Sequence, residues 1–293
     1  MAIVTPMFEA GEIDYASFDN LIEWHIREGT SGIVVVGTSG ESPTVSVDEH
    51  SELIERAVST VNKRIPVIAG TGANSTAESI ELASFAQRVG ADYSLSVVPY
   101  YNKPSQGGLY QHFRKIAESV TMPHILYNVP GRTVADLSND TALKLSEIDN
   151  IVGIKDATGD MARSVDLLRR RPDDFVIYSG DDATFMAYMM LGAEGVISVT
   201  ANVAPSIVQK ICEEVLSSNY ADAIRLNNSI SLLNEALFVE ANPIPVKWAL
   251  QKMGLIGGGI RLPLTGLSSC QHPILLSAMK YAGIQTSTNT PND

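Results

Sequence analysis

The chain has 293 residues, 45% of them hydrophobic and 18% charged, so it can bury one large core or two smaller ones. Its 21 Lys and Arg against 33 Asp and Glu give a formal net charge of −12, which disfavours nucleic acid as a partner. No apolar run approaches about 18 residues and no signal peptide is recognisable, so we expect no membrane association and a cytoplasmic location.

Eight short apolar runs are separated by longer amphipathic segments. In chain order the runs begin at Ala2, Gly32, Pro66, Tyr93, His124, Ile151, Phe175 and Gly195. Between them, Ser46 with Glu49 and Ser75 with Glu78 have the spacing of a helix capping box. Strands that are apolar on both faces and alternate with helices are typical of a parallel sheet covered by helices. Eight such units predict an α/β protein with a (β/α)8 TIM barrel as a catalytic domain over residues 1–203.

Beyond the eighth run the pattern is helical only. Apolar residues recur at helical spacing in 206–216, 220–239, 244–253 and 274–282. We therefore expect residues 204–293 to form a C-terminal helical extension packed on the barrel.

Reactive side chains follow several of the predicted strands. In barrels of this kind the functional groups come from the carboxyl ends of the strands and the loops behind them, so these segments should converge. They are GTSGE (37–41), PYYNKPS (99–105), YNVPGRT (127–133), Lys155 and SGDD (179–182).

Lys155 ends the apolar run IVGI and allows two interpretations. In a water-poor barrel, desolvation penalises the ammonium, and a neutral amine can add to a carbonyl to form a Schiff base. Alternatively, Lys155 forms an ion pair with Asp156 or with a glutamate across the barrel. The hydroxyls of Tyr127, Tyr101 and Thr38 favour the first interpretation, because Schiff-base chemistry needs a proton relay.

Two further groups could bind carboxylates, whereas metal and cofactor signals are weak. The backbone N–H groups of GTSGE offer a nest for a small carboxylate, and Arg132 could bind a second one bidentately. The five histidines have no HxH or HxxxH spacing, and Cys212 and Cys270 form no CxxC. No GxGxxG follows the first predicted strand. We therefore expect neither a metal nor a nucleotide cofactor.

The motifs in this order resemble those of the dihydrodipicolinate synthase family, one of the pyruvate-dependent class I aldolases and lyases. They are GTSGES, VIAGTGANST, PYYNKPSQGGLYQHF, YNVPGRT, GIKDATGD, SGDD, GVISVTANVAP and NPIPVKWAL, spread over about residues 2–264. The resemblance implies a 4-hydroxy-tetrahydrodipicolinate synthase, which condenses pyruvate with L-aspartate 4-semialdehyde in the diaminopimelate pathway of lysine biosynthesis. It also implies a homotetramer built from tight dimers.

The resemblance assigns a role to each candidate residue. Lys155 would form the Schiff base with pyruvate, and Tyr127 would be the central acid and base. Thr38 and a Tyr101 from the neighbouring subunit would complete the proton relay. The substrate-binding set implied is Thr38, Ser39, Arg132, Gly180 and Ile197. Ser39 stands where the family usually has Thr, and Gly131 replaces a common Ser.

In feedback-inhibited relatives lysine binds at positions that match Ser42, Pro43, Val47, His50, Asn74, Glu78 and Tyr100. Strongly inhibited members tend to carry His or Trp where this chain has Val47. We therefore expect weak or absent inhibition by lysine.

Two other functions compete with this interpretation. Another pyruvate-dependent aldolase, such as N-acetylneuraminate lyase or a keto-deoxy sugar acid aldolase, would share the chemistry up to the enamine. Arg132 disfavours it, because a sugar-acid site needs hydroxyl-binding groups there. A non-catalytic barrel would be expected to lack at least one of Lys155, Tyr127, Tyr101 and Thr38, and all four are present.

Overall fold

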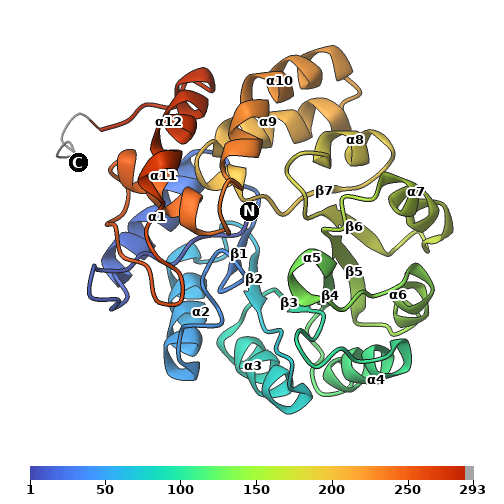
Figure 1. The fold of residues 1–293 in the computed structure, drawn as a ribbon. Helices are drawn as coiled ribbons and strands as arrows, with labels where there is room; N and C mark the ends of the chain where they lie inside the picture. The colour runs from blue at the N-terminus through green and yellow to red at the C-terminus, as the bar shows by residue number, and fades with distance from the viewer. Residues whose placement is uncertain (288–293) are drawn as a thin grey trace.

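Seven parallel strands form the inner layer of the structure, a computed structural model that describes residues 1–287. They are hydrogen-bonded in chain order and curve around a common centre, with the longer helices outside them (Figure 1). Their bounds are β1 Ile33–Val35, β2 Val67–Gly70, β3 Tyr93–Val97, β4 His124–Asn128, β5 Ile151–Asp156, β6 Val176–Ser179 and β7 Gly195–Val196. The seven runs predicted from residue 32 onward are thus confirmed as strands.

The helices alternate with the strands and then continue alone. Between residues 15 and 190 they are α1 Tyr15–Arg27, α2 Val47–Val61, α3 Thr76–Val89, α4 Gln106–Ala117, α5 Pro130–Thr133, α6 Asn139–Leu145, α7 Met161–Arg170 and α8 Phe185–Met190. After β7 come η1 Thr200–Asn202, α9 Pro205–Leu216, α10 Tyr220–Ala236, α11 Ile244–Lys252, η2 Ser269–Gln271 and α12 His272–Tyr281.

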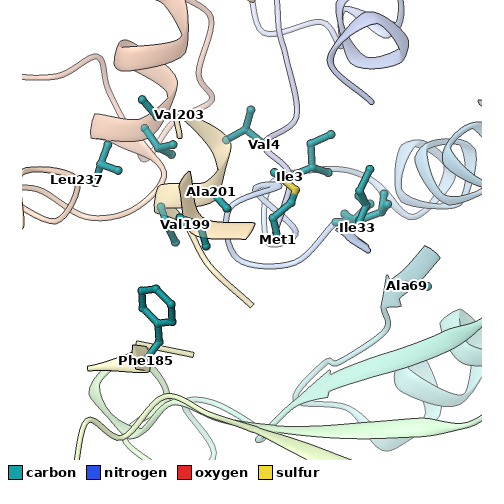
Figure 2. Packing of buried hydrophobic residues seen from close by; sticks show 14 of the residues in the cluster. Met1, Ile3, Val4, Ile33, Ala69, Phe185, Val199, Ala201, Val203 and Leu237 are labelled. Carbon is teal, nitrogen blue, oxygen red and sulfur yellow. The ribbon is translucent and has the colours of Figure 1, made fainter. Parts of the chain in front are cut away.

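The first predicted strand is wrong as a full strand, because only Ala2 forms a bridge, to Val34 of β1. The segment nevertheless joins the two edges of the sheet. Its Ile3 N–H donates to the Val34 carbonyl at 3.0 Å, and its Ala2 N–H donates to the Ser198 carbonyl, just after β7, at 3.1 Å. Figure 2 shows Met1, Ile3 and Val4 packed between Ile33 and the η1 region. Residues 1–4 therefore bond to both edges of the seven-stranded sheet.

Asn202 explains how so short a segment is held in place. Its side-chain amide donates to the Ala2 carbonyl at 2.8 Å and accepts from the Val4 N–H at 3.2 Å. Asn202 is fully buried, so these bonds satisfy backbone groups that water cannot reach. The side chain thereby replaces part of a strand ladder.

The register of β4 against β5 contains one irregularity. His124 pairs with Ile151, but Ile125 pairs with Gly153, so Val152 has no partner on β4. From there the pairing is regular and brings Tyr127 opposite Lys155. Two catalytic candidates are thus neighbours across the sheet.

The predicted C-terminal helices are confirmed as α9, α10, α11 and α12. Helix α10 packs against α9 and α12, and α9 also contacts α8 and η1. Residues 288–293 of the predicted extension lie outside the described part of the chain. Within residues 1–287 there is no helix of the length and apolar character needed to cross a bilayer.

The two predicted capping boxes differ. At the start of α2 both bonds are present, from the Glu49 N–H to the Ser46 hydroxyl at 3.2 Å and from the Ser46 N–H to the Glu49 carboxylate at 2.8 Å. At the start of α3 the Ser75 hydroxyl accepts from the Glu78 N–H at 3.5 Å, without a return bond from the Glu78 side chain. The predicted capping role of the Glu78 side chain is therefore wrong.

Candidate active site

A cavity of about 130 Å³ lies among the carboxyl ends of the strands. It is lined by six of the predicted site residues, namely Thr38, Ser39, Tyr127, Arg132, Lys155 and Gly180. Asp181, which belongs to the predicted segment SGDD, and Asn242, which begins the motif NPIPVKWAL, also line it, together with Val199 and Phe238, which the sequence did not single out. The strand ends meet at one edge of the parallel sheet, and residues between α10 and α11 join them, so segments separated by more than 200 residues share this cavity.

Lys155 lies near the end of β5 and is buried, with 5% of its surface exposed. Its Nζ stands 4.3 Å from the centroid of the Tyr127 ring. Across residues 1–287 no carboxylate forms an ion pair with this amine. The ion-pair interpretation of Lys155 is therefore wrong, and the amine faces the cavity beside a phenol.

Asp156 points away from Lys155, because successive residues of a strand face opposite sides of the sheet. Its carboxylate accepts from the Thr158 N–H at 3.0 Å and from the Tyr188 hydroxyl at 3.2 Å. It is buried between the sheet and helices α7 and α8, where the Ser164 hydroxyl also reaches it. Asp156 therefore fixes the loop behind β5 and does not neutralise the amine.

Gly180 follows β6 and lies directly against the lysine. A Cβ at this position would stand 2.8 Å from Cε of Lys155 and 2.6 Å from Cβ of Ala157. Such contacts are closer than van der Waals packing permits. The absence of a side chain at Gly180 thus gives the Lys155 side chain its space.

The carboxylate-binding candidates are linked by Asn242, in the connection between α10 and α11. The side-chain amide of Asn242 donates to the Ser39 hydroxyl at 3.0 Å, and the backbone carbonyl of Asn242 accepts from the Arg132 guanidinium at 3.3 Å. Asn242 is buried and lines the cavity, and its side-chain oxygen has no partner within residues 1–287. The signal that could have identified it is the motif NPIPVKWAL, which begins with this residue.

Asp182 follows β6 and holds the chain after β7. Its carboxylate accepts from the Ser198 hydroxyl and from the Val199 N–H, the latter at 2.8 Å. The side chain is fully enclosed, and this burial raises the pKa of the carboxyl. Asp182 thereby fixes the segment that carries Val199 into the cavity.

Two predicted site residues lie outside the cavity lining. Ile197 is buried in the same apolar cluster as Tyr127, behind the lining residues. Tyr101 is 88% exposed and has a φ of 74°, an unusual backbone conformation for a residue with a side chain. The structure therefore does not bring Tyr101 together with Lys155 of the same chain.

A second cavity, of about 240 Å³, adjoins the first and shares Thr38, Tyr127 and Arg132 with it. Its lining is mostly apolar and includes three of the predicted lysine-site positions, Ser42, Pro43 and Tyr100.

Two of the remaining lysine-site positions, His50 and Asn74, are held by hydrogen bonds. The buried His50 ring bonds to the Gly70 carbonyl at 2.7 Å, and the Asn74 amide donates to the Tyr100 carbonyl at 3.3 Å. Glu78 is exposed, and burial together with the Glu78 charge raises the pKa of Tyr100.

Comparison with known proteins agrees with this geometry. A sequence profile described as the dihydrodipicolinate synthetase family matches residues 1–282. A 4-hydroxy-tetrahydrodipicolinate synthase from Azoarcus sp. is 61% identical over 285 residues, which are 97% of this chain and 98% of the relative. One from Nitrosospira multiformis is also 61% identical, over 97% of this chain and 95% of its own.

Solved structures agree as well. The chloride-inhibited dihydrodipicolinate synthase from Acinetobacter baumannii, complexed with pyruvate, superposes with a TM-score of 0.96 at 55% identity, covering 97% of this chain and 98% of that one. The dihydrodipicolinate synthase from Aquifex aeolicus superposes with a TM-score of 0.96 at 44% identity, over 98% of each chain. The fold and the cavity define an α/β protein of the class I aldolase kind, with a buried lysine that has no ion-pair partner within residues 1–287. The chain belongs to the dihydrodipicolinate synthetase family.

Proposed function

We propose that this protein is a 4-hydroxy-tetrahydrodipicolinate synthase, which condenses pyruvate with L-aspartate 4-semialdehyde in lysine biosynthesis. The observation that carries the proposal is the buried Lys155 amine, which has no ion-pair partner within residues 1–287 and lies over Tyr127 in a cavity with Thr38, Ser39 and Arg132. An amine in this setting is placed to attack a carbonyl, because it faces the cavity and is not engaged in an ion pair within the described residues. The relatives with 61% identity support the choice of reaction.

In the first half of the reaction Lys155 Nζ attacks C2 of pyruvate and forms a carbinolamine. Loss of water gives the imine, and loss of a proton from C3 gives the enamine. The Tyr127 ring lies 4.3 Å from Nζ, so its phenol is the candidate to move these protons. The pyruvate carboxylate would bind to Thr38 and Ser39, whose loop offers backbone N–H groups.

In the second half the enamine C3 attacks the aldehyde carbon, and the aldehyde oxygen takes up a proton. The amino group of the second substrate then attacks the imine carbon and releases Lys155, which closes the six-membered ring. Arg132 would bind the carboxylate of the semialdehyde bidentately. Gly180 and Ile197 would complete the pyruvate side of the site. No metal or nucleotide cofactor is required, because the lysine itself activates the ketone.

We also propose that the active enzyme is a homotetramer, a dimer of dimers in the cytoplasm. The exposed Tyr101 supports this, since a phenol that its own chain leaves outside the cavity is available to a neighbour. It would enter the partner's site and complete the relay with Tyr127 and Thr38.

The seven strands and residues 1–4 support a (β/α)8 barrel as the catalytic domain, over residues 1–203. Residues 1–4 bond to both sheet edges, which is what closure requires. The helices from α9 onward would then form the extension.

We propose that lysine inhibits this enzyme weakly or not at all. Val47, at the start of α2, is 49% exposed and offers neither a ring nor a charge to an amino acid ligand. Steady-state assays over a lysine titration test this, and strong inhibition at submillimolar lysine would contradict it.

The reaction itself is tested by trapping the imine. The protein is incubated with pyruvate and reduced with borohydride, and the modified peptide is located by mass spectrometry. We expect the pyruvate adduct on Lys155, and a Lys155→Ala variant that stays folded should lose several orders of magnitude in activity. An unmodified Lys155 would refute the mechanism. Turnover of an aldose without turnover of the semialdehyde would instead indicate a sugar-acid aldolase.

A further inference from the structure

A buried ion pair joins the GTSGE loop to the C-terminal helices. Glu41 ends this loop, and Lys247 lies in α11; 0% of the Glu41 side chain and 5% of the Lys247 side chain are exposed. One Glu41 carboxylate oxygen accepts from Lys247 Nζ, and the other accepts from the Arg261 backbone N–H at 3.1 Å. Both oxygens are therefore held by residues that follow the last strand.

Stability alone is a weak explanation for such a pair. Removing two charges from water costs free energy that their attraction often fails to offset, and apolar residues of similar volume can be as stable. Burial accordingly lowers the pKa of Lys247, against the opposing effect of Glu41. Glu41 also has a φ of 58°, a conformation that residues with a Cβ rarely adopt. The pair thus holds the loop in a conformation that costs free energy.

The rest of the loop is fixed around this point. The Glu41 N–H donates to the Thr38 carbonyl at 3.2 Å, so Glu41 and Thr38 belong to one tight turn. Thr5 donates to the Gly40 carbonyl at 2.7 Å. A Cβ on Gly40 would stand 2.9 Å from Cα of Val36, so the turn is tightly packed against the end of β1. Movement of the Glu41 side chain would therefore be transmitted to the backbone at Thr38 and Ser39.

We infer that the Glu41–Lys247 pair is a positioning device for the carboxylate-binding loop, through which α11 sets the orientation of Thr38 and Ser39. This inference rests on the proposed function, because the carboxylate concerned is that of pyruvate. Glu41 and Lys247 do not line the cavity, so they act through the loop and do not touch the substrate.

The first test is the variant Lys247→Met, which keeps the length of the side chain and removes the charge. We expect the KM for pyruvate to rise about tenfold or more, with a smaller change in kcat at saturating pyruvate, because loosened binding can be overcome by concentration. The pyruvate dependence of borohydride trapping on Lys155 should shift by the same factor.

Lys247→Met leaves the Glu41 carboxylate buried without its partner, and this variant could fail to fold for that reason. A second variant removes this difficulty. The double variant Glu41→Gln with Lys247→Met leaves no lone charge, and the amide oxygen of the introduced glutamine can still accept from the Arg261 N–H. We expect it to fold and to keep a raised KM for pyruvate, since the ionic anchor is absent.

The control is the partly buried ion pair between Arg171 and Glu194, in which Nη1 of the arginine lies 2.6 Å from Oε1 of the glutamate. Glu194 directly precedes β7, so this pair lies at the opposite ends of the strands from the loop. Arg171→Met should lower the melting temperature without changing the KM for pyruvate.

The outcomes separate the two proposals. A raised KM in both Lys247 variants, with the control unchanged, supports the positioning role. A KM within twofold of wild type in either folded variant, or an equal rise in Arg171→Met, overturns it. If the wild-type protein forms no pyruvate adduct, the proposed function fails, and the positioning role with it.

Discussion

The space that Gly180 leaves for Lys155 leads to a prediction at the scale of single residues. Gly180→Ala would place a Cβ 2.8 Å from Lys155 Cε, so the lysine must leave its present position. We expect the rate of borohydride-trapped adduct formation to fall by about a hundredfold, because small displacements of a reacting group are costly. Quenched-flow trapping measures this rate directly.

Gly131→Ala is the matched control, since a Cβ at Gly131 would meet no atom within 4 Å. Its trapping rate should equal that of the wild type. An unchanged rate in Gly180→Ala would show that Lys155 can react from a different rotamer, contrary to our interpretation of this glycine.

The sequence predicted Thr38, Ser39, Tyr127, Arg132 and Lys155 as neighbours because each stands at or soon after the carboxyl end of a strand, and these ends meet in a parallel sheet. It could not predict how their loops are held. The contact of Asn242 with Ser39 spans 203 residues, and no periodic pattern encodes so distant a side-chain bond.

The choice between an ion pair and a free amine at Lys155 was also open in the sequence. It depended on whether β5 continues through Asp156, which turns that carboxylate to the opposite face of the sheet, and on whether a glutamate from another element reaches the amine. The extent of a strand end and the contacts between distant elements are not encoded in a periodic pattern.

Among the elements, the N-terminal segment departs most from the sequence prediction. An apolar run predicts burial in any conformation, but a strand also needs length, and residues 1–4 form only one bridge. The strands from β1 to β7 were predictable because each run is flanked by helices with clear starts. The division between a barrel over 1–203 and an extension over 204–293 remains a prediction, because α9 packs on α8 as well as on α10.

Asn202 allows the contribution of this segment to be measured. Asn202→Leu keeps the approximate volume but leaves the Ala2 carbonyl and the Val4 N–H without their bonds in a buried site. We expect a loss of about 3 kcal/mol in the free energy of unfolding, since each unsatisfied buried group costs about 1–3 kcal/mol. Urea unfolding gives the value, and Asn228→Leu on the exposed face of α10 is the control. A loss equal in the two variants would contradict the role of Asn202.

At the scale of the whole molecule, the exposed Tyr101 predicts that the subunits share their active sites. Tyr101→Phe and Lys155→Ala should each be nearly inactive alone. When both are co-expressed, half of the dimers are mixed, and each mixed dimer contains one site with both groups. Activity should then recover to about a quarter of wild type. Activity no higher than the average of the two single variants would place Tyr101 outside its partner's site.

Buried histidines predict how stability depends on pH. Burial lowers the pKa of His25 and of His124 to about 3, whereas in the unfolded chain each is near 6.5. Between these values the unfolded state binds protons that the folded state refuses. The contribution of these two histidines to the free energy of unfolding is therefore fully present above about pH 6.5. It is lost as the pH drops toward 3, by about 1.4 kcal/mol per pH unit for each histidine.

The variant His124→Gln isolates one of these contributions. Glutamine can still bond to the Ser94 hydroxyl, which lies 2.5 Å from Nδ1 of His124, but it takes up no proton. Urea unfolding between pH 7 and pH 4.5 should show a shallower loss of stability than in the wild type. A slope equal to the wild-type slope would mean that His124 does not govern acid unfolding.

The unpaired Val152 in β5 shows that the chemistry depends on the register of the strands as well as on the types of residue. If β5 paired regularly from His124 and Ile151, Tyr127 would face Ile154, and the amine would lie one position further along. The extra residue brings Lys155 opposite the phenol. A deletion at Val152 could be absorbed, because the pairs on either side of it would become continuous. An insertion or deletion after Gly153 would instead turn either Ile154 or Asp156 toward Tyr127, although every catalytic residue type would still be present in the chain.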